Sequence, residues 1–136
     1  MTLKQRIRDH EGFRLEPYTD SEGILTVGYG RNLESTPFTR AEVELMFDTD
    51  FRRAVHGVEN FTFVEHLNEA RKGVVIEMVF QMGVTGVSKF KKFLRAANDH
   101  DWATAAEEML DSRWHKQTPE RAKELAKLFL RGVSER

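Results

Sequence analysis

The sequence predicts an α+β fold in which a small antiparallel β-sheet lobe and a larger helical lobe are joined by a long helix. Three observations lead to this prediction. Residues 15–30 carry β-forming side chains on both sides of a turn, residues 39–58 carry apolar side chains at helical spacing, and the chain after residue 68 is mostly helical in pattern. We expect an active-site cleft between the two lobes.

Two helices are predicted in the N-terminal half. Residues 3–11 form the first, because Leu3 and Ile7 share one helical face and Gly12 is a suitable residue to end it. A longer helix begins at a capping box of Thr39 and Glu42. Its apolar stripe consists of Val43, Met46, Phe47, Ala54, Val55 and Val58.

A β-hairpin is predicted between these helices, over residues 15–30, with its turn at residues 20–23. Side chains alternate along the run after the turn. The face that we expect to pack carries Leu25, Val27 and Tyr29. The face that we expect to stay open carries Thr26, Gly28 and Gly30.

The rest of the chain reads as helices. Residues 68–82 become apolar on all sides from Val74 onward, which is typical of a central buried helix. Capping residues and spacing predict three more helices. These are residues 88–97, residues 101–111 with Asp99 or Asp101 as the cap, and a last helix that starts at Thr118-Pro119, runs to about Leu130 and ends at Gly132.

The composition describes an ordinary soluble protein and excludes several classes of function. The chain has 136 residues, enough for one domain, and its 21 basic and 22 acidic side chains give a net charge of −1. This balance argues against a dedicated nucleic-acid-binding protein. Cysteine is absent, so disulfides and thiolate metal sites are excluded, and the five histidines have no metal-like spacing.

The apolar segments are too short to span a membrane, since none approaches the ~18 residues that a spanning helix needs. The N-terminal stretch MTLKQRIRDHEGF is amphipathic and lacks the continuous apolar core of a signal peptide. We therefore expect no stable membrane insertion. If the protein acts outside the cytoplasm, it needs a separate route of release.

Glu11 stands at the end of its predicted helix, where a carboxylate is unfavourable. The C-terminal end of a helix carries partial negative charge, which disfavours anions. The same field favours the protonated carboxylic acid, the form that general-acid catalysis needs. A residue that breaks a local rule tends to mark function, although an exposed helix-end acid without a role explains Glu11 alone at least as well.

Asp20 gives Glu11 a partner across the hairpin. Two carboxylates on adjacent elements, beside an open strand face, fit glycoside hydrolysis, in which one acid protonates the leaving oxygen and the other activates water or attacks carbon. Thr26 would hold a water on the open face, and side chains at Gly28 and Gly30 would occupy the place of a sugar ring. A β-bulge or tight packing also explains the two glycines, and a turn explains Asp20.

The stretch HEGFRLEPYTDSEGILTVGYGR, residues 10–31, resembles the N-terminal motif of the phage-type lysozymes, glycoside hydrolase family 24. That motif is Glu, eight residues, Asp, five residues, Thr and then Gly-x-Gly, and the chain matches it without a gap from Glu11 to Gly30. MVFQMGVTGVSKF at 78–90 and SRWHKQTPERA at 112–122 are similar to two further segments of the family. Three blocks in the right order make the resemblance specific.

The resemblance implies a lysozyme-like fold of one domain over residues 1–136. Its N-terminal lobe would cover about residues 12–58 and its C-terminal helical lobe about residues 59–136, with the helix of residues 1–11 packing on the C-terminal lobe. Glu11 would be the general acid, and Asp20 and Thr26 would act on the attacking water. Known members of the family invert the anomeric centre, so we expect inversion, for which carboxyl groups roughly 6.5–9.5 Å apart are typical. No cofactor and no metal are expected.

The same resemblance assigns further residues to the site. Substrate-contacting positions fall on Asn32, Phe80, Gln81 and Arg113. Arg121 falls where the family has an arginine paired with the catalytic Glu, here Glu11. Arg31 stands where the family usually has His, and Asp50 falls opposite that position, so we predict an Arg31–Asp50 ion pair that links sheet and helix.

Two other features have simpler explanations than a ligand site. The segment KFKKFLR, residues 89–95, interleaves basic and aromatic residues. An amphipathic helix with Phe90, Phe93 and Leu94 in the core is the simpler interpretation, and a basic face attracted to the anionic cell envelope is the alternative. Trp102 and Trp114 are expected in the core rather than as platforms for sugars.

The residues and the resemblance together predict an endolysin, an N-acetylmuramidase that hydrolyses the β-1,4 bond between N-acetylmuramic acid and N-acetylglucosamine in bacterial peptidoglycan. A lytic transglycosylase is one alternative, but its chemistry needs no second carboxylate. A catalytically silent peptidoglycan-binding or virion structural module is another, against which the three motif residues argue. We expect a monomer whose partner is peptidoglycan and not nucleic acid. Family context implies the host cytoplasm and release through a lesion made by a holin, which is required functionally and not as a binding partner.

Overall fold

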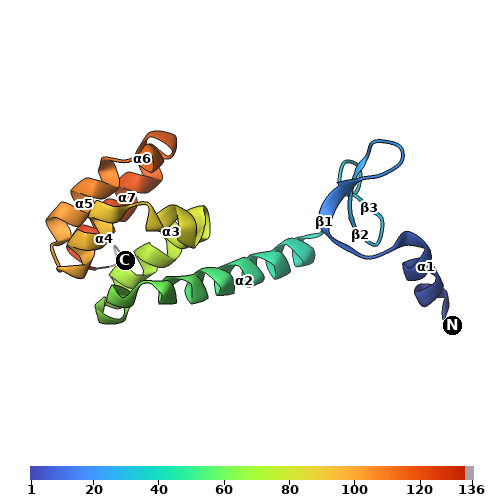
Figure 1. Cartoon of the computed structure of the whole chain (residues 1–136), viewed down its shortest axis with the longest axis horizontal. Coiled ribbons are helices and arrows are strands. Elements are labelled where there is room, and N and C mark those ends of the chain that lie inside the picture. Colours follow the sequence, from blue (N-terminus) through green and yellow to red (C-terminus); the bar gives the residue numbers. More distant parts are fainter. Residues whose placement is uncertain (134–136) are drawn as a thin grey trace. The chain divides into compact units, whose positions relative to one another are not determined.

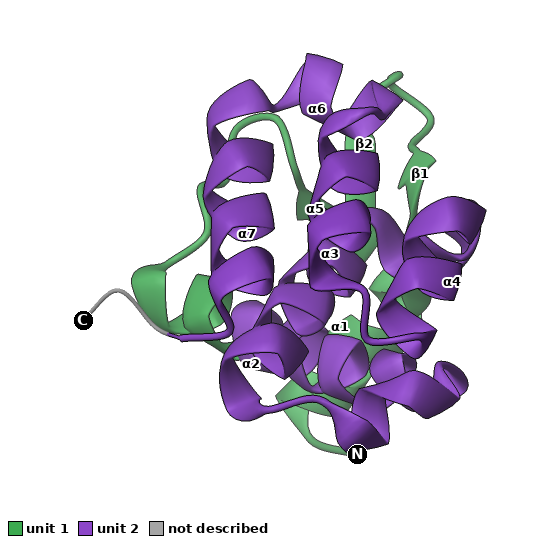
Figure 2. Ribbon diagram, turned by 90° about the vertical axis from the view of Figure 1, so that its left-hand side faces the viewer, with its two compact units in different colours: residues 1–45 green, residues 46–136 purple. Residues whose placement is uncertain are grey.

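The computed structural model describes residues 1–133 and has the α+β architecture that the sequence predicts (Figure 1). The elements are α1 (Leu3–Glu11), β1 (Arg14–Thr19), β2 (Leu25–Gly28), β3 (Arg31–Asn32), α2 (Arg40–Gly57), η1 (Val58–Asn60), η2 (Thr62–His66), α3 (Glu69–Ser88), α4 (Lys91–Asn98), α5 (Trp102–Leu110), α6 (Arg113–Gln117) and α7 (Pro119–Arg131). The chain forms two compact units, which we call unit 1 (residues 1–45) and unit 2 (from residue 46); the boundary falls within α2 (Figure 2).

The helix α1 is closed by local hydrogen bonds at both ends. Thr2 Oγ1 accepts the N–H of Gln5 at 3.2 Å, and Gln5 Oε1 accepts the N–H of Thr2 at 3.0 Å, which completes a capping box. Gly12 follows the helix with a φ of 80°, and its N–H donates to the carbonyl of Arg8 at 2.9 Å. The predicted helix and its terminating glycine are confirmed.

The strands β1, β2 and β3 form one antiparallel sheet in that order, so the predicted hairpin is confirmed. Asp20 N–H donates to the carbonyl of Ile24 at 2.9 Å, and Gly23 N–H donates to the carbonyl of Asp20 at 3.0 Å, which closes the predicted turn. The register between β1 and β2 shifts between Arg14 and Tyr18. Pro17 lies in this interval and has no N–H to donate to a neighbouring strand.

The strand β2 ends earlier than the alternation in the sequence predicts. It stops at Gly28, and the chain turns through Tyr29 and Gly30 into β3. Gly28 has a φ of 69° and Gly30 a φ of 76°, values that glycine adopts without the clash that a Cβ atom would cause. The prediction of a strand that alternates through Gly30 is wrong, because these glycines turn the chain instead of extending it.

The helix α2 begins at the predicted capping box. Thr39 Oγ1 accepts the N–H of Glu42 at 3.2 Å, and Glu42 Oε1 accepts the N–H of Thr39 at 2.7 Å. The helix continues to Gly57 and buries Ala54 in unit 2. Because α2 crosses the boundary between the units, it is the predicted linking helix.

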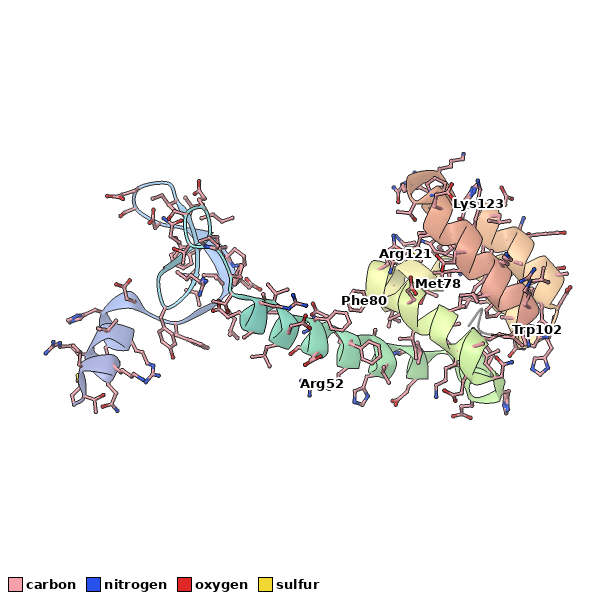
Figure 3. All side chains as sticks on the ribbon, turned by 180° about the vertical axis from the view of Figure 1, so that it is seen from behind. Arg52, Met78, Phe80, Trp102, Arg121 and Lys123 are labelled. Atoms are coloured by element: carbon pink, nitrogen blue, oxygen red, sulfur yellow. The ribbon has the colours of Figure 1, made fainter. Side chains whose placement is uncertain are left out.

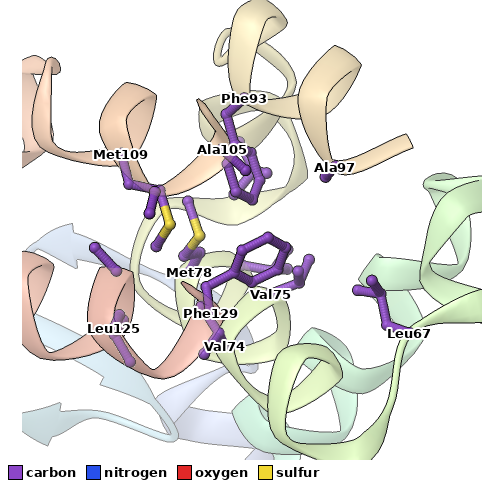
Figure 4. Packing of buried hydrophobic residues seen from close by; sticks show 14 of the residues in the cluster. Leu67, Val74, Val75, Met78, Phe93, Ala97, Ala105, Met109, Leu125 and Phe129 are labelled. Carbon is purple, nitrogen blue, oxygen red and sulfur yellow. The ribbon is translucent and has the colours of Figure 1, made fainter. Parts of the chain in front are cut away.

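The helix α3 is the centre of the hydrophobic core of unit 2 (Figure 4). Val75 and Met78 have no exposed surface and belong to the same cluster as Phe93 of α4, Met109 of α5 and Phe129 of α7. The rings of Phe93 and Phe129 lie 5.2 Å apart. Each large side chain buried in this way stabilises the fold by roughly 1.5–3 kcal/mol. The predicted central buried helix is confirmed.

Gly83 breaks the regular course of α3. Its φ of 77° and ψ of 168° are not helical, so the predicted helix of residues 68–82 corresponds to the part before the break, and a second part continues to Ser88. Glycine relieves the steric cost of such a break. Among residues 1–133, neither α3 nor any other helix has the length and apolar character to cross a membrane.

The helices α4, α5 and α7 match the three that were predicted, whereas α6 (Arg113–Gln117) was not predicted. Of the two predicted caps for α5, Asp101 is the one used, since its Oδ1 accepts the N–H of Thr104 at 3.2 Å. Pro119 occupies the first turn of α7, and Gly132 ends that helix with a φ of 69°. Thr118 precedes Pro119, but its side chain makes no capping hydrogen bond to α7, so the predicted side-chain cap is wrong. Its hydroxyl donates to the carbonyl of Trp114 at 3.2 Å.

Arg71 of α3 closes the C-terminal end of α7. Its Nε donates to the carbonyl of Phe129 at 2.7 Å and its Nη2 to that of Leu130 at 3.0 Å. These carbonyls lie in the last turn of α7, where helical partners are lacking. The guanidinium also lies 4.0 Å from the centroid of the Trp102 ring. Trp102 packs against the core and Trp114 is buried, as predicted.

Candidate functional site

The predicted site residues are divided between the two units. Unit 1 contains Glu11, Asp20, Thr26, Gly28, Gly30, Arg31 and Asn32. Unit 2 contains Asp50, Phe80, Gln81, Arg113 and Arg121. The cleft between the lobes and the packing of residues 1–11 on the C-terminal lobe stay predictions.

The carboxylate of Glu11 lies against the backbone of Gly30. A Cβ atom added at Gly30 would collide with this carboxylate and would stand 3.0 Å from Glu11 Cδ. Glycine is therefore required at this position for room as well as for its φ of 76°. We expected the space beside Gly30 to receive a sugar ring. That prediction is wrong, because the Glu11 side chain occupies the space.

Aromatic and cation–π contacts hold α1 against the turn between β2 and β3. The Tyr29 ring lies 5.4 Å from the Phe13 ring, and the Arg8 guanidinium lies 5.7 Å from the Tyr29 centroid. Each such contact contributes about 0.5–1.5 kcal/mol. Because Arg8 shares α1 with Glu11 and Tyr29 precedes Gly30, these contacts position the carboxylate beside the turn. The sequence reasoning treated Tyr29 only as a strand residue; an aromatic between the two glycines was the available signal.

Asp20 and Thr26 are both hydrogen-bonded to the backbone of Ile24. Asp20 Oδ1 accepts the N–H of Glu22 at 2.8 Å and that of Ile24 at 2.9 Å. The carbonyl of Ile24 accepts the Thr26 hydroxyl at 2.9 Å and the N–H of Asp20 at 2.9 Å. The Asp20 carboxylate and the Thr26 hydroxyl are therefore oriented by the same residue.

Thr26 is buried, which corrects the prediction of an open face. Its exposed fraction is 4%, whereas Leu25 is 44% and Tyr29 is 46% exposed. The predicted packed and open faces are thus reversed at these positions. Burial of the hydroxyl is tolerated because Thr26 donates to a backbone carbonyl. A hydroxyl that has already donated its hydrogen retains only acceptor capacity for a ligand or water.

Gly28 and Asn32 lie on either side of the turn between β2 and β3. A Cβ atom at Gly28 would have no heavy atom within 4 Å, which fits the expectation of free space at this glycine. Asn32 Oδ1 accepts the N–H groups of Glu34 at 2.8 Å and Ser35 at 3.0 Å. This turn holds the carboxamide of Asn32 in one orientation.

Within unit 1, Arg31 pairs with Glu42. Arg31 Nη1 lies 2.8 Å from Glu42 Oε2, Nη2 lies 3.3 Å from Glu42 Oε1, and Nη2 also donates to the carbonyl of Pro37 at 2.7 Å. Asp50 has an ion pair with Arg53 at 3.9 Å. Glu42, in the first turn of α2, offers both carboxylate oxygens to Arg31 within unit 1. The capping box was the signal that placed Glu42 there. The Arg31–Asp50 ion pair would join unit 1 to unit 2 and stays a prediction.

Arg121 of α7, labelled in Figure 3, forms an ion pair within unit 2. Its Nε lies 2.7 Å from Oε2 of Glu77 on α3, a residue that the sequence reasoning did not assign to the site. Both side chains are partly exposed, so the pair contributes at most about 1 kcal/mol. The pairing of Arg121 with Glu11 that the resemblance implies stays a prediction.

Gln81 links α3 to α6. Its Oε1 accepts the indole N–H of Trp114 at 2.9 Å, and its Nε2 lies 3.5 Å from Thr118 Oγ1. Trp114 is only 4% exposed, so its N–H needs a partner inside the protein. Gln81 therefore has a structural role in addition to its predicted contact with a substrate.

Two cavities in unit 2 contain predicted site residues in their walls. One, of about 510 Å³, is lined by Phe80 and Asp50. The Phe80 ring, labelled in Figure 3, lies 5.6 Å from the ring of Phe47. The other cavity, of about 640 Å³, is lined by Arg113 and Lys91.

The segment of residues 89–95 lies beside this second cavity. Phe93 is buried, and Phe90 and Leu94 pack against the core, so the interpretation as an amphipathic helix is confirmed. Lys89, Lys91 and Lys92 line the cavity. Within residues 1–133, no group of three or more His, Cys, Asp or Glu side chains is arranged to hold a metal ion.

Gly30→Ala is expected to destabilise the protein more than Gly23→Ala does. Both positions have positive φ, which costs an alanine about 1–2 kcal/mol, but only at Gly30 does the new Cβ meet the Glu11 carboxylate. Urea denaturation of both variants measures the difference. In a Glu11→Ala background, Gly30→Ala should lower the free energy of unfolding by no more than Gly23→Ala does. If the two substitutions lower it equally while Glu11 is present, the collision is contradicted.

The chain is similar in sequence to several known proteins. A family model described as phage lysozyme matches residues 8–135. The chain is 32% identical to a probable T4-type lysozyme 2 of Dictyostelium discoideum, over 97% of this chain and 95% of that protein. It is 28% identical to the pre-baseplate central spike protein Gp5 of Enterobacteria phage T4, over 97% of this chain and 28% of that protein. It is 27% identical to a SAR-endolysin of Bacteriophage PS119, over 76% of this chain and 62% of that protein.

Proposed function

Since the chain belongs to the phage lysozyme family and is a lysozyme-type hydrolase acting on peptidoglycan, we propose that it is an N-acetylmuramidase. It cleaves the β-1,4 bond between N-acetylmuramic acid and N-acetylglucosamine. Glu11 is the general acid, Asp20 is the general base, and Thr26 orients the attacking water. The reaction is a single displacement that inverts the anomeric centre.

Glu11 supplies the proton for the leaving oxygen. It is the last residue of α1. The Gly30 backbone and the contacts of Tyr29 restrict where its carboxyl group lies. Placement of one such acid accounts for about 10²–10⁴ of a rate enhancement.

The link between Asp20 and Thr26 through Ile24 is the observation that carries the proposal. Asp20 Oδ1 is engaged by two backbone N–H groups, so we assign Oδ2 to the water. Thr26 has donated its hydrogen to Ile24 and so accepts a hydrogen from the water. A water that donates to both Asp20 and Thr26 directs a lone pair toward the sugar.

The bonds and protons balance in one step. The water oxygen bonds to the anomeric carbon of N-acetylmuramic acid while its proton passes to Asp20. The bond from that carbon to the glycosidic oxygen breaks, and this oxygen takes the proton of Glu11. Arg121 then stabilises the ionised Glu11, as the family resemblance implies.

Substrate contacts extend over both units. The free space at Gly28 receives part of a sugar, and the amide N–H groups of Asn32 donate to it. Phe80, Gln81 and Arg113 add contacts from unit 2. The ring of Phe80 is 38% exposed and offers an apolar surface to a sugar face.

The biological role that we propose is that of an endolysin. The protein acts as a monomer on the cell wall and does not bind nucleic acid. It is made in the host cytoplasm and reaches peptidoglycan through a lesion made by a holin, which it need not bind. Similarity to a protein named SAR-endolysin supports a role in lysis.

Analysis of the products from purified peptidoglycan tests this proposal. We expect new reducing ends on N-acetylmuramic acid, and proton NMR of early products should show the α-anomer, because inversion of a β bond yields α. Products that have lost a water and end in an anhydro ring would instead identify a lytic transglycosylase. Binding to peptidoglycan without new ends would identify a silent binding module. Early β-anomer would replace single displacement with a covalent intermediate.

A further inference from the structure

A second network in unit 1 joins the Gly30 turn to the start of α2. We propose that Glu42 is a positioning residue for Glu11, acting through Arg31 and Gly30. This role depends on the proposed role of Glu11 as the general acid. It gives an ion pair outside the catalytic motif a function in the reaction.

The ion pair between Glu42 and Arg31 has a defined geometry. Both oxygens of Glu42 face Arg31, at 2.8 Å and 3.3 Å, and the carbonyl of Pro37 accepts from the same guanidinium at 2.7 Å. The guanidinium also lies 4.7 Å from the centroid of the Phe38 ring. Two parallel hydrogen bonds to one carboxylate give an arginine a defined position as well as energy.

Within unit 1, Glu42 supplies the counter-charge of Arg31. The Arg31 side chain is 29% exposed, and its Nε is buried without a hydrogen-bond partner among the described residues. Glu42 is the acid in ion-pair contact with it. A guanidinium that is largely removed from water is stable only beside a counter-charge. Neutralising Glu42 should therefore release Arg31 from its place.

Glu42 keeps its charge over a wide range of pH. The N–H and hydroxyl of Thr39, and then Arg31, hold the pKa of Glu42 below its ordinary value of 4.5. The carboxylate is therefore ionised at every pH well above 4.5. The same carboxylate closes the capping box of α2, so it connects the Arg31 guanidinium to the first turn of that helix.

The backbone connects Arg31 to the acid. Gly30 directly precedes Arg31, and its backbone is in contact with the Glu11 carboxylate. Release of Arg31 would let the Gly30 turn shift and change where Glu11 lies. Displacements of about 1 Å in a catalytic group can lower a rate by 10²-fold, so a modest shift should be measurable in kcat.

The test compares Glu42→Gln with Thr39→Ala in the 136-residue protein, using release of reducing ends from peptidoglycan and thermal denaturation. Glu42→Gln keeps the size of the side chain and an acceptor for Thr39 but removes the counter-charge of Arg31. Thr39→Ala removes one hydrogen bond of the same capping box and leaves the ion pair intact. We expect both variants to lower Tm, and only Glu42→Gln to lower kcat, by about tenfold with little change in KM.

The double variant Arg31→Gln/Glu42→Gln tests the route through Arg31. Its kcat should equal that of Glu42→Gln, because residues that act as one unit do not have multiplicative effects. Multiplicative losses, or a kcat for Glu42→Gln within twofold of that of Thr39→Ala, would overturn the inference. The variant Glu11→Gln separates failure of this inference from failure of the proposed function. If Glu11→Gln is inactive and either overturning result is seen, only the role of Glu42 is rejected. If Glu11→Gln is fully active, Glu11 is not the general acid, and both the proposed function and the role of Glu42 are rejected.

Discussion

Glu11→Gln is expected to lower kcat for peptidoglycan hydrolysis by about 10⁴-fold, at the upper end of what one acid–base group contributes. A glutamine keeps the size of the side chain beside Gly30 and still accepts hydrogen bonds, but it has no acidic proton for the leaving oxygen. Glu11 is exposed at the end of α1, so the substitution removes no core contact. KM should change little, because the lost interaction belongs to the transition state. Release of reducing ends under saturating substrate measures the effect.

Glu16→Gln is the matched control for this substitution. Glu16 is an exposed acid on β1 in the same unit, and its replacement makes the same change in charge. We expect activity within twofold of wild type and an unchanged Tm. Equal loss of activity in both variants would mean that net charge, and not the acid at residue 11, controls the rate.

Asp20→Asn is expected to lower kcat by about 10³-fold, within the range for a general base. The asparagine carbonyl oxygen can still accept the N–H groups of Glu22 and Ile24, so the turn between β1 and β2 should be retained. What the variant loses is the oxygen that takes the proton of the water. Kinetics on peptidoglycan, together with a Tm close to that of wild type, would separate loss of the base from loss of the turn.

Azide separates a base from a merely electrostatic role of Asp20. Azide attacks carbon without giving up a proton, so it should restore cleavage in Asp20→Asn and not in Glu11→Gln, with an inverted glycosyl azide as the product. Glu22→Gln, which removes an exposed acid from the same turn, should need no rescue. Failure of azide in Asp20→Asn would indicate that Asp20 stabilises charge in the transition state instead of removing a proton.

The local structure was largely predictable because it depends on residues that are close in sequence. The capping box of Thr39 and Glu42, the cap at Asp101 and the glycine that ends α7 all involve hydrogen bonds over three or four residues. The apolar period of α3 likewise predicted its burial. In the caps at Thr39 and Asp101, the side chain and the backbone N–H that donates to it lie within one helical turn of each other.

The partners of charged and polar residues were not predictable in the same way. Within unit 1, Arg31 pairs with Glu42 of the capping box, a partner that the family pattern did not indicate, because the short segment before α2 brings the capping residue to the end of the sheet. Thr26 was placed on an open face by alternation, but it is buried, and its hydrogen bond to the Ile24 carbonyl offsets the cost of burying the hydroxyl. Alternation says which side of a strand a residue occupies, and it does not say which side is covered.

The sequence by itself determined the family, the positions of the main helices and the identity of the acid, base and threonine candidates, since periodicity, capping and a gapless motif are all readable along the chain. Tertiary structure alone decided that Gly30 makes room for the Glu11 carboxylate, that Ile24 joins Asp20 to Thr26 and that Glu42 holds Arg31. The physical reason is distance along the chain. A contact between residues 11 and 30 depends on how one helix and three strands are turned against one another, and no local preference of either residue specifies that geometry.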